Sequence, residues 1–133
     1  MSRKTAREAA FKTIFEIPFH DIETPADIIN FGVNYDENKL NSQSDTDYFV
    51  NTVTTCFENI SAIDDKISAL LKGWTIDRIS KVNLSILRLA MCEILFIEDI
   101  PYQVSINEAV ELAKIFGDDD APSFINGVLA SSI

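Results

Sequence analysis

The side chains that could support catalysis are few and scattered along the chain. The single histidine, His20, lies close to Pro18 in a stretch expected to be a loop, and no nucleophile motif accompanies it. The four glycines occur singly, so the sequence has no glycine-rich loop of the kind that holds phosphates. Two cysteines and one histidine do not make a zinc site. We therefore expect no enzymatic activity, no metal and no cofactor.

Three consecutive carboxylates, Asp118 to Asp120, form the densest cluster of potential metal ligands. A calcium loop needs oxygen ligands at alternating positions and a glycine at its turn, and this run has neither. We interpret it as a solvent-exposed run that supplies the cap of the following helix. Cys56 and Cys92 occur in apolar helical patterns, so we interpret both as reduced core residues, with a disulfide or redox pair as the alternative.

Charge is distributed unevenly along the chain. The protein has 11 Lys and Arg against 21 Asp and Glu, a net charge of −10, which disfavours binding to nucleic acid through a broad basic surface. Residues 1–12 nevertheless carry four cations and one acid, whereas residues 89–133 carry Lys114 against eight acids. Such a polarised molecule could place its basic end on RNA or offer its acidic part to a basic protein.

Two arginines lie within apolar patterns. Arg7 projects onto the edge of an apolar helical face with Arg3 one turn earlier, an arrangement compatible with an anion or with a carboxylate across the bundle. Arg88 interrupts an otherwise apolar helix, where an unpaired charge would be costly. We expect Arg88 to form a structural ion pair, with Glu93 or Glu108 as candidate partners.

Apolar residues recur at helical spacing near the N-terminus. Thr5 and Glu8 form a capping-box pattern, Pro18 ends the first apolar face, and Thr24 followed by Pro25 is typical of a second helix start. The sequence predicts helices over residues 6–18 and 25–31 and a loop over residues 32–45.

The middle of the chain has a regular apolar register across residues 47–72. It predicts one long helix or two successive helices, with Ser61 and Asp64 as a candidate internal cap. Gly73 is expected to end this segment, and residues 75–80 to form a short helical turn.

The C-terminal part is also predicted to be helical. Residues 82–97 are apolar on nearly every side, as in the central helix of a core. Ser105 and Glu108 form a third capping-box pattern that opens a helix over residues 106–116, which Gly117 ends. A last helix begins near Asp120 and carries Phe124, Ile125, Val128 and Leu129 inward. No segment shows a convincing strand pattern, so we expect an all-α fold of about seven helices in one domain.

The longest apolar run, residues 94–97, is far shorter than the roughly 20 residues needed to cross a bilayer. The N-terminus is basic, but its amphipathic continuation is not a signal-peptide core. A soluble, cytoplasmic protein that does not bind membranes is expected.

Five short motifs, taken in order, are similar to those of one family, the transcription antitermination factor NusB. They are residues 6–10 (AREAA), 86–90 (ILRLA) with Glu93, 100–102 (IPY), 106–114 (INEAVELAK) and 124–129 (FINGVL). Each motif is weak alone, but the set spans essentially the whole chain. The resemblance implies a compact helical bundle in two halves, without catalysis.

The resemblance also implies partners. Members of this family bind ribosomal protein NusE and boxA RNA within the RNA polymerase antitermination complex. The RNA contacts are expected near the basic N-terminus and the start of the last helix, at Arg3, Lys4, Arg7, Lys114 and Phe116. The NusE surface is expected before and within the apolar helix, at Asp77, Lys81 and Asn83.

Two other functions fit parts of the sequence. A related helical domain opens ribosomal RNA methyltransferases, although Gly127 within the Asn126 to Val128 motif favours the free-standing factor. An acidic helical adaptor that binds only protein is the third interpretation. The exposed part of the apolar helix could also support a homodimer.

Overall fold

The computed structural model describes residues 2–20, 22–33, 40 and 42–132 of the protein. Within these residues the chain forms seven α-helices and two 3-10 helices and contains no strand, so the all-α prediction is confirmed. The chain divides into two compact units, Met1–Glu58 and Asn59–Ile133. None of the described helices is both long enough and apolar enough to span a membrane.

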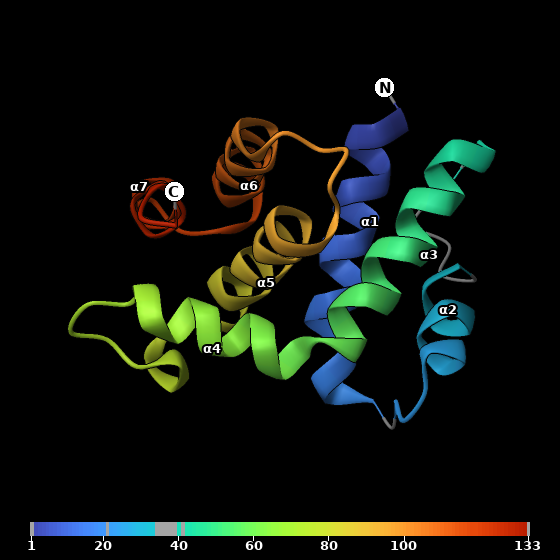
Figure 1. Ribbon diagram of the computed structural model, residues 1–133, viewed down its shortest axis with the longest axis horizontal. Helices are drawn as coiled ribbons and strands as arrows, with labels where there is room; N and C mark the ends of the chain where they lie inside the picture. The colour runs from blue at the N-terminus through green and yellow to red at the C-terminus, as the bar shows by residue number, and fades with distance from the viewer. Residues whose placement is uncertain (1, 21, 34–39, 41, 133) are drawn as a thin grey trace. The chain divides into compact units, whose positions relative to one another are not determined.

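The first unit contains three α-helices, which Figure 1 shows beside one another. Helix α1 packs against α3, and the shorter α2 contacts both. Ala10 and Ile14 of α1 and Phe49 and Val53 of α3 are fully or almost fully buried, as their helical spacing predicts. The elements are α1 (Ser2–Glu16), η1 (Ile17–Phe19), α2 (Pro25–Val33) and α3 (Gln43–Glu58).

The predicted starts of the helices in this unit are partly wrong. Helix α1 begins before Thr5, so the Thr5 and Glu8 pattern is not a capping box. The second start is confirmed, because the Asp27 amide donates to Thr24 Oγ1 over 3.3 Å and α2 begins at Pro25. The loop predicted over residues 32–45 is too long at both ends, because residues 32–33 belong to α2 and residues 43–45 to α3. Residues 34–39 and 41 lie outside the described part.

The second unit is built around α5, which contacts α4, α6 and α7. Nine residues of α5 are buried, including Ile86, Leu87 and Met91, so its predicted central position is confirmed. Cys92 of α5 and Cys56 of the first unit are both buried, and neither forms a disulfide. The elements are α4 (Ile60–Leu70), η2 (Ile76–Arg78), α5 (Lys81–Phe96), α6 (Tyr102–Phe116) and α7 (Ala121–Ala130).

The regular register of residues 47–72 is divided between two helices. The division falls at Asn59, which separates α3 from α4, and Ser61 lies inside α4 and caps nothing. Helix α4 ends at Leu70, and Gly73 follows with a φ of 80°, a left-handed conformation that glycine adopts easily. The short turn predicted before α5 is confirmed as η2.

The start of α6 was also predicted too late. Helix α6 begins at Tyr102, so Ser105 lies inside it and is not a cap. The Ser105 hydroxyl instead donates to Glu93 Oε1 over 2.8 Å, and both residues are buried. The Ser105 hydroxyl therefore makes a hydrogen bond, but this bond joins α6 to α5 and does not cap the start of α6.

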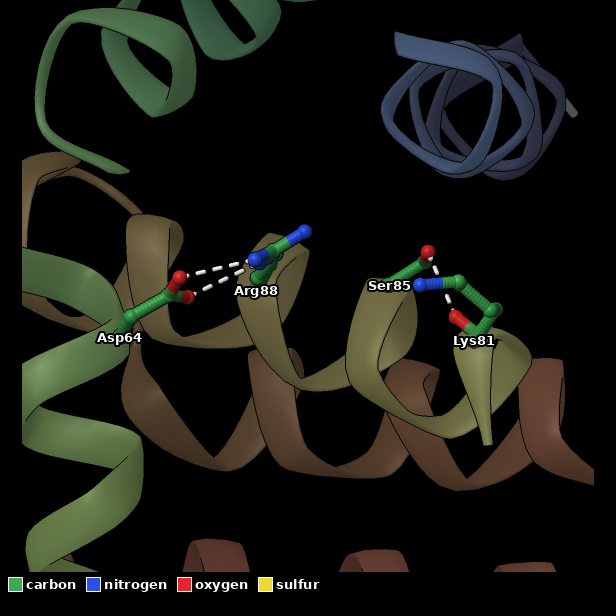
Figure 2. Close-up of polar contacts among 4 residues, drawn as sticks. All are labelled: Asp64, Lys81, Ser85 and Arg88. Atoms are coloured by element: carbon green, nitrogen blue, oxygen red, sulfur yellow. Dashed lines mark hydrogen bonds and ion pairs between the residues drawn. The ribbon is translucent and has the colours of Figure 1, made fainter. Parts of the chain in front are cut away.

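Arg88 forms the expected structural ion pair, and the partner in the structure is Asp64 of α4. The Arg88 Nε and Nη2 atoms donate to the two carboxylate oxygens over 2.9 and 2.8 Å, a two-point contact visible in Figure 2. One turn earlier, Ser85 bonds within its own helix to the Lys81 carbonyl, also in Figure 2.

Candidate nucleic-acid and partner interface

The first turns of α1 carry the predicted basic cluster. Lys4 is exposed there, whereas the Arg3 side chain lies outside the described residues. An exposed lysine on a helical turn can hold a phosphate as a mobile point charge. Lys4 is therefore the cation of the predicted cluster that the structure shows to be exposed.

Arg7 has a different environment. Its side chain is 5% exposed, and its guanidinium lies 5.5 Å from the centre of the Tyr48 ring of α3. A cation over an aromatic face is stabilised by the ring quadrupole, more strongly when water is excluded. The sequence left open an anion or a carboxylate as the partner of Arg7, and the structure adds an aromatic contact that ties α1 to α3.

The last turn of α6 carries the second predicted group of RNA contacts. Lys114 is exposed and pairs with Glu111 over 3.0 Å, and Phe116 is half-buried at the end of the helix. A surface pair of this kind contributes little to stability, so Lys114 can exchange its carboxylate for another anion at small cost. Gly117 ends α6 as predicted.

The predicted partner-binding residues lie together around the start of α5. Asp77 is exposed in η2 and accepts a hydrogen bond from the Thr75 hydroxyl. Lys81 is the exposed first residue of α5. The Ser80 hydroxyl caps this helix by accepting from the Asn83 amide over 3.1 Å. The helix start therefore has a fixed geometry, from which Lys81 reaches solvent, whereas Asn83 is half-buried.

Asn83 also lines a cavity of about 290 Å³ within the second unit. The cavity is bounded by η2, the first turn of α5, the loop after α6 and the first turn of α7. Its lining consists of Trp74, Arg78, Ile79, Ser80, Asn83, Asp118, Asp120 and Phe124.

The aromatic residues of this lining were not among the binding residues predicted from the sequence. Trp74 is 55% exposed, and its ring meets that of Phe124 edge to face at 6.5 Å between centroids. Phe124 was expected in the core, but it is only half-buried and lines the cavity. The two residues come from distant parts of the chain, so only the packing of α7 brings them together.

The carboxylate run does not act as a side-chain cap. Asp120 occupies the N-cap position of α7, but its carboxylate makes no capping bond. Asp118 Oδ1 instead accepts from the Asp120 amide over 3.1 Å, which closes a local turn. The exposed carboxylates of Asp118 and Asp120 thus remain at the edge of the cavity.

Comparison with known proteins assigns the chain to a family. Residues 4–133 match the NusB family. The chain belongs to the NusB family. It is 48% identical over 132 residues to the transcription antitermination protein NusB of Natranaerobius thermophilus, covering 97% of this chain and 92% of that protein.

Solved structures of the NusB family share the fold. The structure of NusB from T. maritima is 33% identical and superposes with a TM-score of 0.87, covering 99% of this chain and 90% of that one. A structure of antitermination factors NusB and NusE in complex with dsRNA is 28% identical, with a TM-score of 0.85, covering 98% of this chain and 95% of that one. The predicted NusB resemblance is confirmed over essentially the whole chain.

Proposed function

We propose that this protein is a transcription antitermination factor. It binds ribosomal protein NusE and boxA RNA, and it keeps RNA polymerase transcribing through ribosomal RNA operons. The observation that carries the proposal is membership of the NusB family over residues 4–133, together with the fold shared with a relative solved with NusE and RNA. The protein acts in the cytoplasm by binding alone, without catalysing a reaction.

The RNA contacts in this proposal are Arg3, Lys4, Lys114 and Phe116. The cations hold phosphates, Lys4 and Lys114 being exposed, and the partly exposed phenylalanine stacks on a base. Arg7 contributes mainly by fixing the first turns of α1 against Tyr48, because so little of its side chain reaches solvent. Arg3 is proposed from its charge and its place in the sequence, and the other three residues from their chemistry and exposure.

The NusE contacts in this proposal are Asp77, Lys81 and Asn83, around the start of α5. The second unit carries 11 acidic and 6 basic residues, and this negative excess suits a basic ribosomal protein. A homodimer could use an exposed apolar part of the same unit, such as Leu95 and Phe96 at the end of α5.

A transcription assay tests the function directly. RNA polymerase transcribes a template that carries boxA upstream of a terminator, in the presence of NusE and the other elongation factors. The proposal predicts more read-through when this protein is added and no increase when boxA is scrambled. Equal read-through from the two templates would contradict it.

A further inference from the structure

Exposed apolar side chains gather where α5 turns into α6. Among the described residues seven large hydrophobic side chains are exposed, and four of them lie within ten residues of the sequence, each 38–42% exposed. They are Leu95 and Phe96 in the last turn of α5 and Tyr102 and Val104 in the first turn of α6. Apolar side chains scattered singly over a surface need no explanation, whereas several in one place mark a surface for a partner. We call residues 95–104 the α5–α6 corner.

Hydrogen bonds within the second unit hold the backbone of this corner in place. The Ile97 amide donates to the Glu93 carbonyl over 3.1 Å, and the Ile100 amide donates to the Ile97 carbonyl over 3.3 Å, which closes the turn. Beside the turn, the buried Ser105 hydroxyl donates to Glu93 Oε1 and joins the two helices. A surface that is already formed loses little conformational entropy when a partner binds to it.

The charges in this part of the sequence are all negative. Glu98 and Asp99 are exposed in the turn, between the two pairs of apolar side chains. Residues 89–113 contain five acidic residues and no lysine or arginine. A protein segment with an apolar side chain between lysines or arginines complements both the apolar side chains and the carboxylates.

RNA and a second copy of this chain complement the corner less well. The two carboxylates of the turn repel RNA phosphates. In a two-fold symmetric dimer the same patch meets itself, so Glu98 and Asp99 of each copy would approach an equally acidic patch. Charge therefore favours a basic protein as the occupant.

We propose that the α5–α6 corner docks a basic segment of a second protein partner, separate from NusE. The inference goes beyond the proposed function, which places NusE at the start of α5. Helix α5 has 16 residues, so a rise of 1.5 Å per residue puts its two ends about 23 Å apart. This distance leaves room for a folded partner at one end and a short segment at the other. The segment packs an apolar side chain against Phe96 and Tyr102 and places its cations beside Glu98 and Asp99.

Fluorescence anisotropy of two labelled peptides, each titrated with the full-length protein, tests the proposal. The first peptide is helical, with leucine and tryptophan on one face and arginines beside them. The second keeps the arginines and has serine at each apolar position. The proposal predicts that the first peptide binds at least about tenfold more tightly than the second, that salt weakens its binding, and that saturating NusE leaves its affinity unchanged.

Phe96→Ser and Ile115→Ser form a matched pair of variants, because both remove one exposed apolar side chain and only Phe96 lies at the corner. Phe96→Ser should weaken binding of the first peptide at least about tenfold, and Ile115→Ser should leave it unchanged. Far-UV circular dichroism checks that both variants are folded.

A second pair of variants tests the charges without touching an apolar side chain. Glu98→Gln combined with Asp99→Asn should weaken binding of the first peptide and reduce its dependence on salt. Asp65→Asn combined with Asp119→Asn removes two exposed carboxylates elsewhere in the second unit, so net charge changes equally while the corner stays intact. This control should bind the peptide clearly more tightly than the corner variant.

The possible results separate this proposal from the proposed function. Equal affinities for the corner variants and their controls overturn the docking surface. Displacement of the peptide by NusE assigns the corner to NusE and overturns a separate partner. Self-association that Phe96→Ser abolishes, without peptide binding, assigns the corner to a homodimer and also overturns the proposal. Each of these results leaves the boxA-dependent read-through assay as an independent test of antitermination.

Discussion

Arg88 shows how a charge is accommodated within an apolar helix. Its side chain is 17% exposed and that of Asp64 is 27% exposed, so the two-point contact is largely shielded from water. The sequence predicted that Arg88 must be paired, because an isolated charge in such a helix is costly. It did not predict Asp64, because nothing local indicates which turn of another helix will face the guanidinium.

Replacing Asp64 by asparagine should destabilise the protein. The expected loss is about 2 kcal/mol, between the values for exposed and fully buried pairs, because Arg88 loses its charged partner but keeps a polar neighbour. Urea unfolding measures the effect. Asp65→Asn removes an exposed carboxylate one residue away and serves as the control. Equal midpoints for the two variants would contradict a stabilising role for the pair.

The two buried serine hydroxyls of the second unit should contribute different amounts to the stability of the protein. Ser105→Ala removes the hydrogen bond that joins α6 to Glu93 of α5, and we expect a loss of about 1–3 kcal/mol. Ser85→Ala removes a bond to its own helix at the Lys81 carbonyl, so its cost should stay below about 1 kcal/mol. Thermal unfolding of the two variants ranks them, and the reverse order would contradict the account.

At the scale of elements, the junction between α6 and α7 depends on a glycine. A Cβ atom on Gly117 would overlap that of Ala121 and lie 2.9 Å from the Ala113 carbonyl oxygen. Gly117→Ala should therefore destabilise the protein by about 1–3 kcal/mol, because backbone must shift. This junction also forms one side of the Trp74 cavity, so the variant should change Trp74 fluorescence.

Gly127 is the matched control for that substitution. It lies within α7, and a Cβ atom added there would meet nothing within 4 Å. Gly127→Ala should stabilise the protein by about 0.5–1 kcal/mol, because alanine loses less backbone entropy in a helix. Differential scanning calorimetry of both variants should give shifts of opposite sign. A loss of stability in both would contradict the crowding argument.

The start of α2 should be sensitive to acid. Hydrogen bonds from the Glu23 and Thr24 amides and the Thr24 hydroxyl lower the pKa of Asp27, despite a small opposing effect of burial. Because the folded-state pKa is depressed, the stabilisation is present above the ordinary carboxyl pKa and is lost as the pH falls through the folded value. Asp27→Asn should therefore reduce stability at neutral pH and have little effect in strong acid.

Urea unfolding at a series of pH values measures this effect, with Asp99→Asn as a control at an exposed carboxylate. A difference between wild type and Asp27→Asn that stays constant down to strong acid would contradict the role of these hydrogen bonds.

The elements were predictable to different degrees. Apolar periodicity correctly indicated the helices, because the burial of one face repeats along each of them. The starts of α1 and α6 were predicted too late, because Thr5 and Ser105 match a capping pattern although they lie inside their helices. A serine whose hydroxyl bonds to another helix, like Ser105, can lie in the same local sequence pattern as a serine that caps a helix start.

At the scale of the molecule, the sequence predicted the binding surfaces only as segments of the chain and not as groups of residues that lie together in space. The start of α5 was expected to bind a partner, and Asn83 does line a cavity there. Trp74 and Phe124 were not included, because they approach one another only when α7 packs in the second unit. Local spacing cannot show such long-range pairs.

Net charge sets the expected RNA affinity of the whole protein. With a charge of −10, long-range repulsion opposes the approach of RNA phosphates, and the few cations of α1 compensate only locally. We expect weak binding of RNA by the protein alone, tighter binding when basic NusE shares the contact, and a decline with salt in both cases. Tight boxA binding by the isolated protein at physiological salt would contradict this expectation.

The central claim is that this protein and NusE together recognise boxA RNA. The most direct test is a fluorescence titration of labelled boxA RNA and a scrambled strand, with and without NusE, at two salt concentrations. The account predicts selective binding of boxA that NusE strengthens and that Arg3→Ala with Lys4→Ala weakens. Equal binding of the two strands in the presence of NusE would contradict it and leave an acidic protein adaptor as the better explanation.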